Sequence, residues 1–249
     1  MRNMKIAVIS DIHGNCLALE TALADLAEHP ADQIVCLGDA VQGGAQPSQT
    51  VARLRDLGCP IVMGNADNWL LTGAVLNPEE IVTEKQRQAR EWALTQLSTE
   101  DKSFIESFQP TVEISLGESS LLCFHGSPAS FDEVILPDTP EEDVQRMLGE
   151  FLPSITTGGH THTQFVRRVG DAAFFFNPGS VGVAYNRHHP EPKFHLDTWA
   201  EYAVLSVDGE RMSLEFRRVP FSFDTFERIV RESGRPNAQE YAAQYRPQS

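Results

Sequence analysis

The stretch MKIAVISDIHGN, residues 4–15, joins a short apolar run to a polar turn. Residues 4–10 are rich in side chains that favour a strand, and the turn after them carries Asp11 and His13. Residues 16–28 then repeat apolar side chains at broadly helical spacing. The stretch therefore predicts a strand followed by a helix, with Asp11 and His13 at the carboxyl end of the strand.

The same order of strand, polar loop and helix continues along the chain. Residues 33–37 (QIVCL) predict a second strand, which is followed by the loop GDAVQGGAQP and by a helix that begins at Pro47. Residues 60–63 (PIVM) predict a third strand, which opens into the loop GNADNWLL. Strands that alternate with helices predict a largely parallel sheet that binds ligands at the carboxyl ends of its strands. We therefore expect the three polar loops at one edge.

The rest of the chain predicts further helices and a second group of strands. Residues 78–109 are charged and helical in pattern, and we interpret them as an inserted helical hairpin with candidate buried positions at Trp92, Leu94, Leu97, Phe104 and Phe108. Strands are predicted at 111–116, 121–124, 155–157, 164–169, 173–176, 202–207 and 212–219. The segment 222–249 predicts a short helical tail. We expect one domain over residues 1–249, with a mixed or antiparallel sheet in its second half.

Composition limits the classes of function. The chain has 249 residues, of which 41% are hydrophobic and 22% charged, as in a folded globular protein. The net charge of -15 opposes stable binding to duplex nucleic acid, so an anionic substrate needs a local positive centre. No apolar stretch resembles a signal peptide or a membrane span, and we expect a cytoplasmic protein without membrane contact. The four cysteines are scattered singly, which argues against a disulfide framework or a thiolate zinc site.

Seven candidate metal ligands follow the predicted strands in chain order: Asp11, His13, Asp39, Asn65, His125, His160 and His162. Taken singly, each has an ordinary explanation as a helix cap, a turn residue or a loop histidine. Carboxylates and imidazoles without thiolates suit Mn²⁺, Fe, Zn²⁺, Co²⁺ or Ni²⁺. Seven ligands exceed what one such ion normally takes, so the combination favours two ions that share a carboxylate.

These motifs resemble the calcineurin-like metallophosphoesterases. The resemblance runs from Ser10 to about Gly182 through D-x-H, G-D-x-V-x-G-G, G-N-x-D, H-G-S-P, G-H-T-H and N-P-G-S-V. The chain most resembles the compact bacterial phosphodiesterase branch. The protein Ser/Thr phosphatases, in contrast, carry an aspartate and an arginine where this chain has Gln42-Gly43-Gly44. The resemblance implies a four-layer α/β/β/α sandwich, in which two mixed sheets are flanked by helices.

The resemblance also implies how the ligands divide between two divalent ions, among which we favour manganese. One ion would be held by Asp11, His13, Asp39 and His162, and the other by Asp39, Asn65, His125 and His160. Asp39 would bridge the ions, and a hydroxide between them would attack phosphorus in line. Asp39, Asn65 and His125 are therefore our candidate catalytic positions.

The chain departs from the family pattern at Ala66. The family motif usually reads Gly-Asn-His, and its histidine helps the leaving group to depart, whereas this chain reads GNAD. Loss of general acid help typically costs about 10² to 10⁴ in rate, which favours esters with a good leaving group. Arg187, His188 or His189 in the segment YNRHHPEPKFH are possible replacements, although we favour a solvated loop for that segment.

We expect a phosphodiesterase that acts on a small phosphate ester or a nucleotide. The enzymatic alternatives are a dinucleoside polyphosphate hydrolase, a phosphomonoesterase or a protein phosphatase. A non-catalytic scaffold, like the retromer subunit of this family, would be expected to lose ligands, and all seven are present here. Three further points stay open. A homo-oligomer is one possible assembly, and Trp69 and Phe131 either flank a base or an aromatic leaving group or pack in the core. Asn177, Ser180 and Gly182 either line the site or form a structural turn, which we favour.

Overall fold

The first of two sheets unites the two ends of the chain. The computed structural model describes residues 4–75, 81–117, 119–149, 153–171, 173–186, 194–209 and 211–245. The sheet has the order β2-β1-β8-β9 and consists of β1 (Met4–Ile9), β2 (Gln33–Cys36), β8 (Trp199–Asp208) and β9 (Arg211–Pro220). β1 pairs with β2 in parallel and with β8 antiparallel, so the sheet is mixed.

The second sheet is built from the middle of the chain and is also mixed. Its order is β3-β4-β5-β7-β6, with bounds β3 (Val112–Ser115), β4 (Ser120–Cys123), β5 (Ile155–Thr157), β7 (Ala173–Asn177) and β6 (Phe165–Val169). The three central strands β4, β5 and β7 run parallel, whereas β3 and β6 close the edges in antiparallel pairs.

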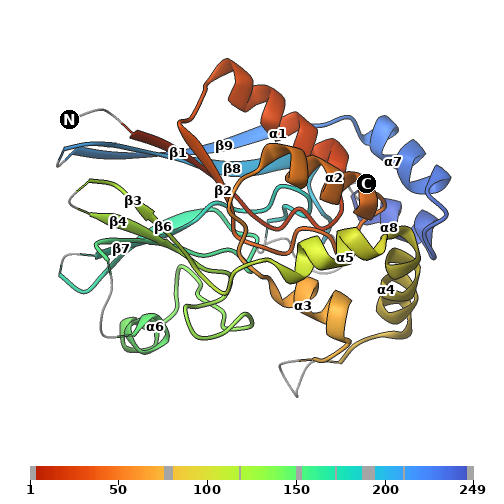
Figure 1. Ribbon diagram of the computed structural model, residues 1–249, viewed down its shortest axis with the longest axis horizontal. Coiled ribbons are helices and arrows are strands. Elements are labelled where there is room, and N and C mark those ends of the chain that lie inside the picture. The colour runs from red at the N-terminus through yellow and green to blue at the C-terminus, as the bar shows by residue number, and fades with distance from the viewer. Residues whose placement is uncertain are drawn as a thin grey trace.

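Helices cover the outer face of each sheet (Figure 1). They are α1 (Cys16–Glu28), α2 (Pro47–Leu57), α3 (Asn65–Thr72), α4 (Glu84–Gln96), α5 (Thr99–Glu106), α6 (Glu141–Leu148), α7 (Phe223–Glu232) and α8 (Ala238–Ala243). Helix α6 lies beside the second sheet, and the other labelled helices lie toward the first sheet or at the end of the sandwich that holds α3, α4 and α5. Both α4 and α5 fall within residues 78–109, and α7 and α8 within 222–249.

The strand β1 shows why the sandwich has four layers. Ile6 and Val8 belong to the apolar cluster between the two sheets, whereas Ala7 and Ile9 belong to the cluster that the helices cover. Alternate residues of a strand point to opposite faces, so a central strand buried on both faces needs apolar side chains at successive positions. A third cluster joins α6 to the second sheet through Val144 and Phe175. The predicted α/β/β/α architecture is confirmed.

Three local predictions differ from the structure. Residues 60–63 do not form a strand of either sheet, because Ile61 and Val62 make only isolated bridges, to Cys36 and Gln109, before the chain turns at Gly64. The predicted loop GNADNWLL contains α3, which ends at Gly73 in the left-handed conformation. Helix α6 was not expected, although three acidic residues in its first turn and its buried Val144 and Leu148 are typical of an amphipathic helix.

The predicted burial of the helical hairpin and of the cysteines is largely observed. Leu97 and Phe108 are buried, and the other three candidate positions of the hairpin are partly buried against the same core. All four cysteines are unpaired; Cys59 alone is only half-buried. Within the residues that the structure describes, no helix has the length and apolar character that a membrane crossing requires.

Candidate metal centre

All seven candidate ligands lie where strands or turns end at one edge of the sandwich. Asp11 and His13 follow β1, and Asp39 follows β2. His125 follows β4, and His160 and His162 follow β5. Asn65 is the first residue of α3. The two sheets therefore each contribute loops to a shared edge.

The ligands form two neighbouring groups. Asp11, His13 and His162 each offer a ligand atom within 4.8 Å of the others, and Asp39, His125 and His160 do the same. Asn65 joins the second group, because its Oδ1 lies 3.0 Å from Nε2 of His125. Asp39 lies between the groups, with Oδ2 at 3.6 Å from Nε2 of His13 and 3.4 Å from Nε2 of His125. The structure thus brings all seven together and places Asp39 between the two groups.

Backbone carbonyls orient three of the imidazole rings. In each ring Nδ1 lies 2.8 Å from a carbonyl oxygen, and the pairs are His13 with Gln42, His125 with Leu37, and His162 with Val183. A carbonyl oxygen only accepts, so Nδ1 donates its hydrogen and Nε2 faces the centre. The Nε2 atoms of His13 and His162 are 3.2 Å apart, a contact that needs a proton or a metal ion between the two nitrogens. Metal binding would displace such a proton.

The backbone is strained at the ligand positions. Among the described residues, six non-glycine residues have positive φ, and five of them are candidate ligands: Asp11 (53°), His13 (49°), Asp39 (49°), His160 (67°) and His162 (52°). Each such position costs of the order of 1–3 kcal/mol and persists only when its surroundings fix it. Here the backbone N–H groups of Asp11 and His13 donate to the carbonyls of Gly38 and Asp39 at 3.0 and 2.8 Å. Strain concentrated in this way is typical of functional sites.

Asp11 presents an unsatisfied oxygen to the first group. Its Oδ2 accepts hydrogen bonds from the Ser10 hydroxyl at 2.6 Å and from the backbone N–H of His160 at 3.1 Å. Its Oδ1 is buried and accepts no hydrogen bond within the described part of the chain, yet it lies 3.2 Å from Nε2 of His162. A buried carboxylate oxygen without a partner is costly, and a cation at this point would satisfy it. These residues therefore fit a metal ion.

The loop of Asp39 and the start of α3 hold each other in place. Oδ1 of Asp39 accepts from the backbone N–H of Ala66 at 2.8 Å. In return, the carboxylate of Asp67 accepts from the backbone N–H groups of Ala40 at 2.9 Å and Val41 at 3.0 Å. A side chain at Gly64 would place its Cβ 2.1 Å from Oδ1 of Asp39, so only glycine permits this approach. Asp67 thus positions the Asp39 loop.

Electrostatics keep the ligand carboxylates ionised. Burial alone would raise the pKa of Asp39, but the charge of His125 and the other imidazoles outweighs it, and the pKa lies below its ordinary value. Burial likewise lowers the pKa of His125, but the neighbouring Asp39 reverses this and raises it to about 10. Burial and the charge of Asp39 raise the pKa of Asp67 to about 7, although the charge of His125 opposes them. Anionic oxygens are therefore available at the centre near neutral pH.

The turn N-P-G-S-V supports the ligand loops. The Ser180 hydroxyl donates to the carbonyl of Asp11 at 2.7 Å, and the backbone N–H of Gly182 donates to the same oxygen at 3.0 Å. The Asn177 amide donates to the carbonyl of Gly159 at 2.6 Å. Of the two interpretations left open for this turn, the structural one matches these contacts.

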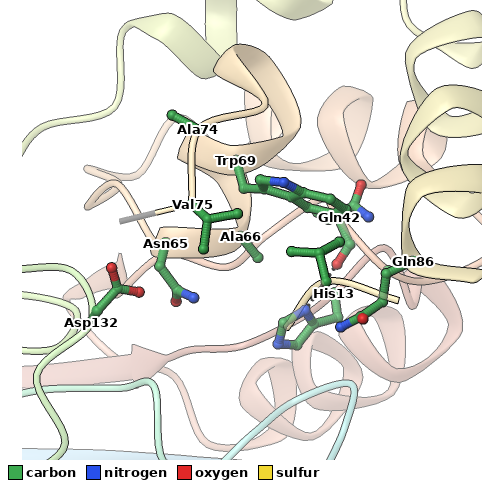
Figure 2. Close-up of a pocket in the computed structure, with 11 residues that line it drawn as sticks. His13, Gln42, Asn65, Ala66, Trp69, Ala74, Val75, Gln86 and Asp132 are labelled. Carbon is green, nitrogen blue, oxygen red and sulfur yellow. Dashed lines mark hydrogen bonds between the residues drawn. The ribbon is translucent and has the colours of Figure 1, made fainter. Parts of the chain in front are cut away.

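A pocket adjoins the centre on the side of α3 (Figure 2). His13, Asn65 and Ala66 line it together with Trp69, whereas Phe131 is not among its lining residues. Gln42, Gln86 and Asp132 also line it, and sequence reasoning did not identify them as site residues. Gln42 lies in the G-D-x-V-x-G-G motif, which did not mark it as a pocket residue, and no motif marks Gln86 or Asp132. Arg187, His188 and His189 lie outside the described residues.

Comparisons with known proteins find similar sequences and similar folds. The model of the calcineurin-like phosphoesterase superfamily domain matches residues 4–206. An uncharacterized protein, MJ0912, of Methanocaldococcus jannaschii is 28% identical over 243 residues, which cover 91% of this chain and 92% of the relative. A metallophosphoesterase from Sphaerobacter thermophilus superposes with a TM-score of 0.72 at 26% identity over 97% of both chains. A hypothetical protein from Pyrococcus horikoshii, PH1004, has a TM-score of 0.75 at 17% identity over 96% of both chains.

Proposed function

Because this chain belongs to the calcineurin-like phosphoesterase superfamily, and is thus a hydrolase of phosphoric esters, we propose that it is a dinuclear metal-dependent phosphodiesterase. The observation that supports this most strongly is the pair of ligand groups with Asp39 between them. Seven ligand positions held by strained, hydrogen-bonded loops exceed the needs of a single ion.

The ligands would divide as the resemblance implies. Asp11, His13, Asp39 and His162 would hold one divalent ion, and Asp39, Asn65, His125 and His160 the other. Bound there, two ions supply an activated water as nucleophile and neutralise charge on the phosphoryl oxygens. The donor set has no thiolate and suits Mn²⁺, Fe, Co²⁺, Ni²⁺ or Zn²⁺, of which we favour manganese.

The protein's own residues mainly fix positions. The carbonyl contacts aim the imidazoles of His13, His125 and His162, and Asp67 holds the loop of Asp39. Ala66 has no proton to donate to a leaving group. The chain therefore favours a substrate whose leaving group departs as a weakly basic anion.

The same observation supports one further candidate, a dinucleoside polyphosphate hydrolase. Cleavage of a phosphoanhydride expels a phosphate, which needs little protonation, so Ala66 is compatible with that reaction. Both candidates act on small phosphate compounds and use the same centre. We also propose that residues 1–249 act as one domain, since β8 and β9 complete the sheet that β1 and β2 begin.

A panel of substrates tests these candidates. The purified chain is loaded with each of the five metals and assayed with bis-p-nitrophenyl phosphate, p-nitrophenyl phosphate and a dinucleoside tetraphosphate. The two nitrophenyl esters release the same leaving group, which needs no proton donor, so their difference in rate measures the preference for a diester over a monoester. We expect the diester to turn over fastest. Faster cleavage of the tetraphosphate would favour the anhydride hydrolase. Absence of turnover with every metal would refute both.

A further inference from the structure

The pocket beside the metal centre has the dimensions of a site for one ring. Its volume is about 180 Å³, which is smaller than the roughly 300–1,000 Å³ that encloses a drug-sized ligand. His13 and Asn65, one from each ligand group, form part of its wall. A group attached to a phosphate at the centre therefore has a direct path into the pocket.

One wall of the pocket is aromatic and held in place. Trp69 is half-buried, and its ring has the guanidinium of Arg90 at 5.6 Å from its centroid. Nε of Arg90 also donates to the carbonyl of Trp69 at 2.8 Å. Ala66 precedes Trp69 by three residues in α3, so both lie on the same side of the helix. The small side chain of Ala66 leaves open the space beside the indole that a larger residue would fill.

Gln42 gives the pocket an unused hydrogen-bond acceptor. This residue is only 5% exposed, and its side-chain Oε1 is buried without a partner in the described residues. Its backbone carbonyl is a separate group, which accepts from Nδ1 of His13. Figure 2 shows the Gln42 amide next to the Trp69 ring. A buried amide oxygen without a partner costs of the order of the hydrogen bond it lacks, so it calls for a ligand that carries an N–H or O–H donor.

Two polar side chains mark the opposite ends of the pocket (Figure 2). The Oε1 of Gln86 already accepts from Thr83 at the start of α4, so only its amide N–H₂ group is left to donate. In Figure 2 this nitrogen faces His13. Asp132 lies beyond Asn65 at the other end, with Oδ2 buried and without a partner in the described residues. The pocket thus offers an aromatic face, hydrogen-bond acceptors and one amide donor.

We propose that this pocket binds the base of a nucleotide, with the flat ring against Trp69 and an N–H of its edge donating to Oε1 of Gln42. A nucleobase combines the aromatic face and the edge donors that these walls require, whereas a sugar, an alkyl chain or an amino-acid ester lacks one or both. The assignment rests on the proposed function, since the phosphate of the nucleotide would lie at the metal centre.

Binding of three probes to the metal-loaded full chain tests the proposal. Titration calorimetry compares AMP, ribose 5-phosphate and adenosine. AMP and ribose 5-phosphate share the phosphate and the sugar, so their ratio of affinities measures the base alone. We expect AMP to bind about tenfold more tightly, which is typical of one aromatic stack with one hydrogen bond. Adenosine has no phosphate, so its affinity reports binding to the pocket alone, and we expect it to bind weakly but measurably.

Two variants locate the effect. Trp69→Leu should bring the ratio of the affinities for AMP and ribose 5-phosphate close to one, because the hydrogen bond needs the stacked base. Gln42→Leu should lower this ratio about threefold. In both variants the affinity for ribose 5-phosphate should stay within about twofold. Trp199→Leu replaces a partly exposed tryptophan outside the pocket and should leave the ratio unchanged. Gln42→Leu keeps the backbone carbonyl that orients His13. This variant therefore still tests the proposal if Trp69→Leu fails to fold.

The outcomes separate this proposal from the proposed function. Equal affinities for AMP and ribose 5-phosphate in the wild type, or a ratio that both variants leave unchanged, would overturn the nucleotide assignment even if bis-p-nitrophenyl phosphate is hydrolysed. Absence of hydrolysis together with a tenfold AMP preference that Trp69→Leu removes would retain the pocket and overturn the phosphodiesterase. If the chain binds neither metal nor any phosphate probe, adenosine decides: its failure to bind overturns the pocket as well.

Discussion

The metal centre and the adjoining pocket share His13 and Asn65 but differ in how their side chains are held. At the centre, five ligands occupy strained backbone positions and three rings are fixed by carbonyls. In the pocket, Trp69 and Gln86 project from helices of ordinary geometry, where Arg90 contacts Trp69 and Thr83 contacts Gln86. A strained loop tolerates little change, whereas a helical side chain can be exchanged without moving the backbone. The chemistry of such an enzyme is therefore rigidly built, and its specificity is easily altered.

The largest effect is expected at Asp39, the residue between the two ligand groups. Asp39→Asn replaces an anionic oxygen by a neutral amide, so both ions should be lost or weakened together. We expect hydrolysis of bis-p-nitrophenyl phosphate to fall at least about 10³-fold, equivalent to about 4 kcal/mol. Metal analysis after dialysis should find fewer than one ion per chain. Asp56→Asn, at an exposed position of α2, is the matched control and should keep both ions.

Two bound ions per Asp39→Asn chain would contradict the bridging role. Loss of only one ion would also be informative, because it would mean that one of the two groups binds its metal without Asp39. Retention of both ions would show that the centre tolerates replacement as readily as the pocket, and the contrast between them would fail.

A second prediction uses a buried carboxylate that has no imidazole beside it. Glu201 is 4% exposed, and burial raises its pKa to about 7 although Arg218 contacts it at 2.7 Å. A raised pKa means that the native state holds a proton that the unfolded state releases, so this stability is present below about pH 4.5 and is lost as the pH rises through 7. The ligand carboxylates of the centre have the opposite shift.

Glu201→Gln removes this titration. Between pH 5 and pH 8 the free energy of unfolding of the wild type should fall relative to the variant by up to about 3 kcal/mol. Urea unfolding of both proteins at each pH gives the difference, in which titrations common to the two proteins cancel. A difference that is independent of pH would show that Glu201 stays ionised in the fold beside Arg218.

Asp67 tests whether the centre depends on the contacts around its ligands. Asp67→Asn has one acceptor oxygen where the carboxylate has two, so one of the Ala40 and Val41 N–H groups would face an amide donor. Changes of this kind typically cost about 10- to 100-fold in metal affinity. Competition with a chromophoric chelator measures the metal affinity of the variant and of the wild type. Asp56→Asn again serves as the control. An unchanged metal affinity would mean that the backbone of the Asp39 loop holds its conformation without the Asp67 carboxylate.

The sequence predicted the centre far better than the pocket, for a physical reason. Asp11, His13, His160 and His162 lie in short motifs at strand ends, and a strand end fixes where its loop goes. The pocket instead joins Gln42 to residues of α3, the start of α4 and the loop after β4, and no local pattern records how separate segments meet. Helix α3, which was expected as a loop, and the whole of α6 were missed although their signals are present: Gly73 ends the first, and acidic residues open the second.

The smallest effect is expected at Arg90, which holds the aromatic wall of the pocket. Gly73, at a φ of 71°, lets the guanidinium approach α3, since a Cβ at that position would lie 3.2 Å from Nη2 of Arg90. Arg90→Met keeps the length of the side chain but removes the cation–π contact and the hydrogen bond to Trp69, which together should be worth about 0.5–1 kcal/mol at a half-exposed site. The preference for AMP over ribose 5-phosphate should therefore fall about two- to fivefold in calorimetry, less than for Trp69→Leu.

Arg87→Met, one turn earlier on the exposed side of α4, should have no effect. If Arg90→Met weakened ribose 5-phosphate as much as AMP, Arg90 would act on the phosphate by its charge. Complete loss of the preference would show that the wall depends on Arg90 alone and is not the exchangeable helical element that distinguishes the pocket from the metal centre.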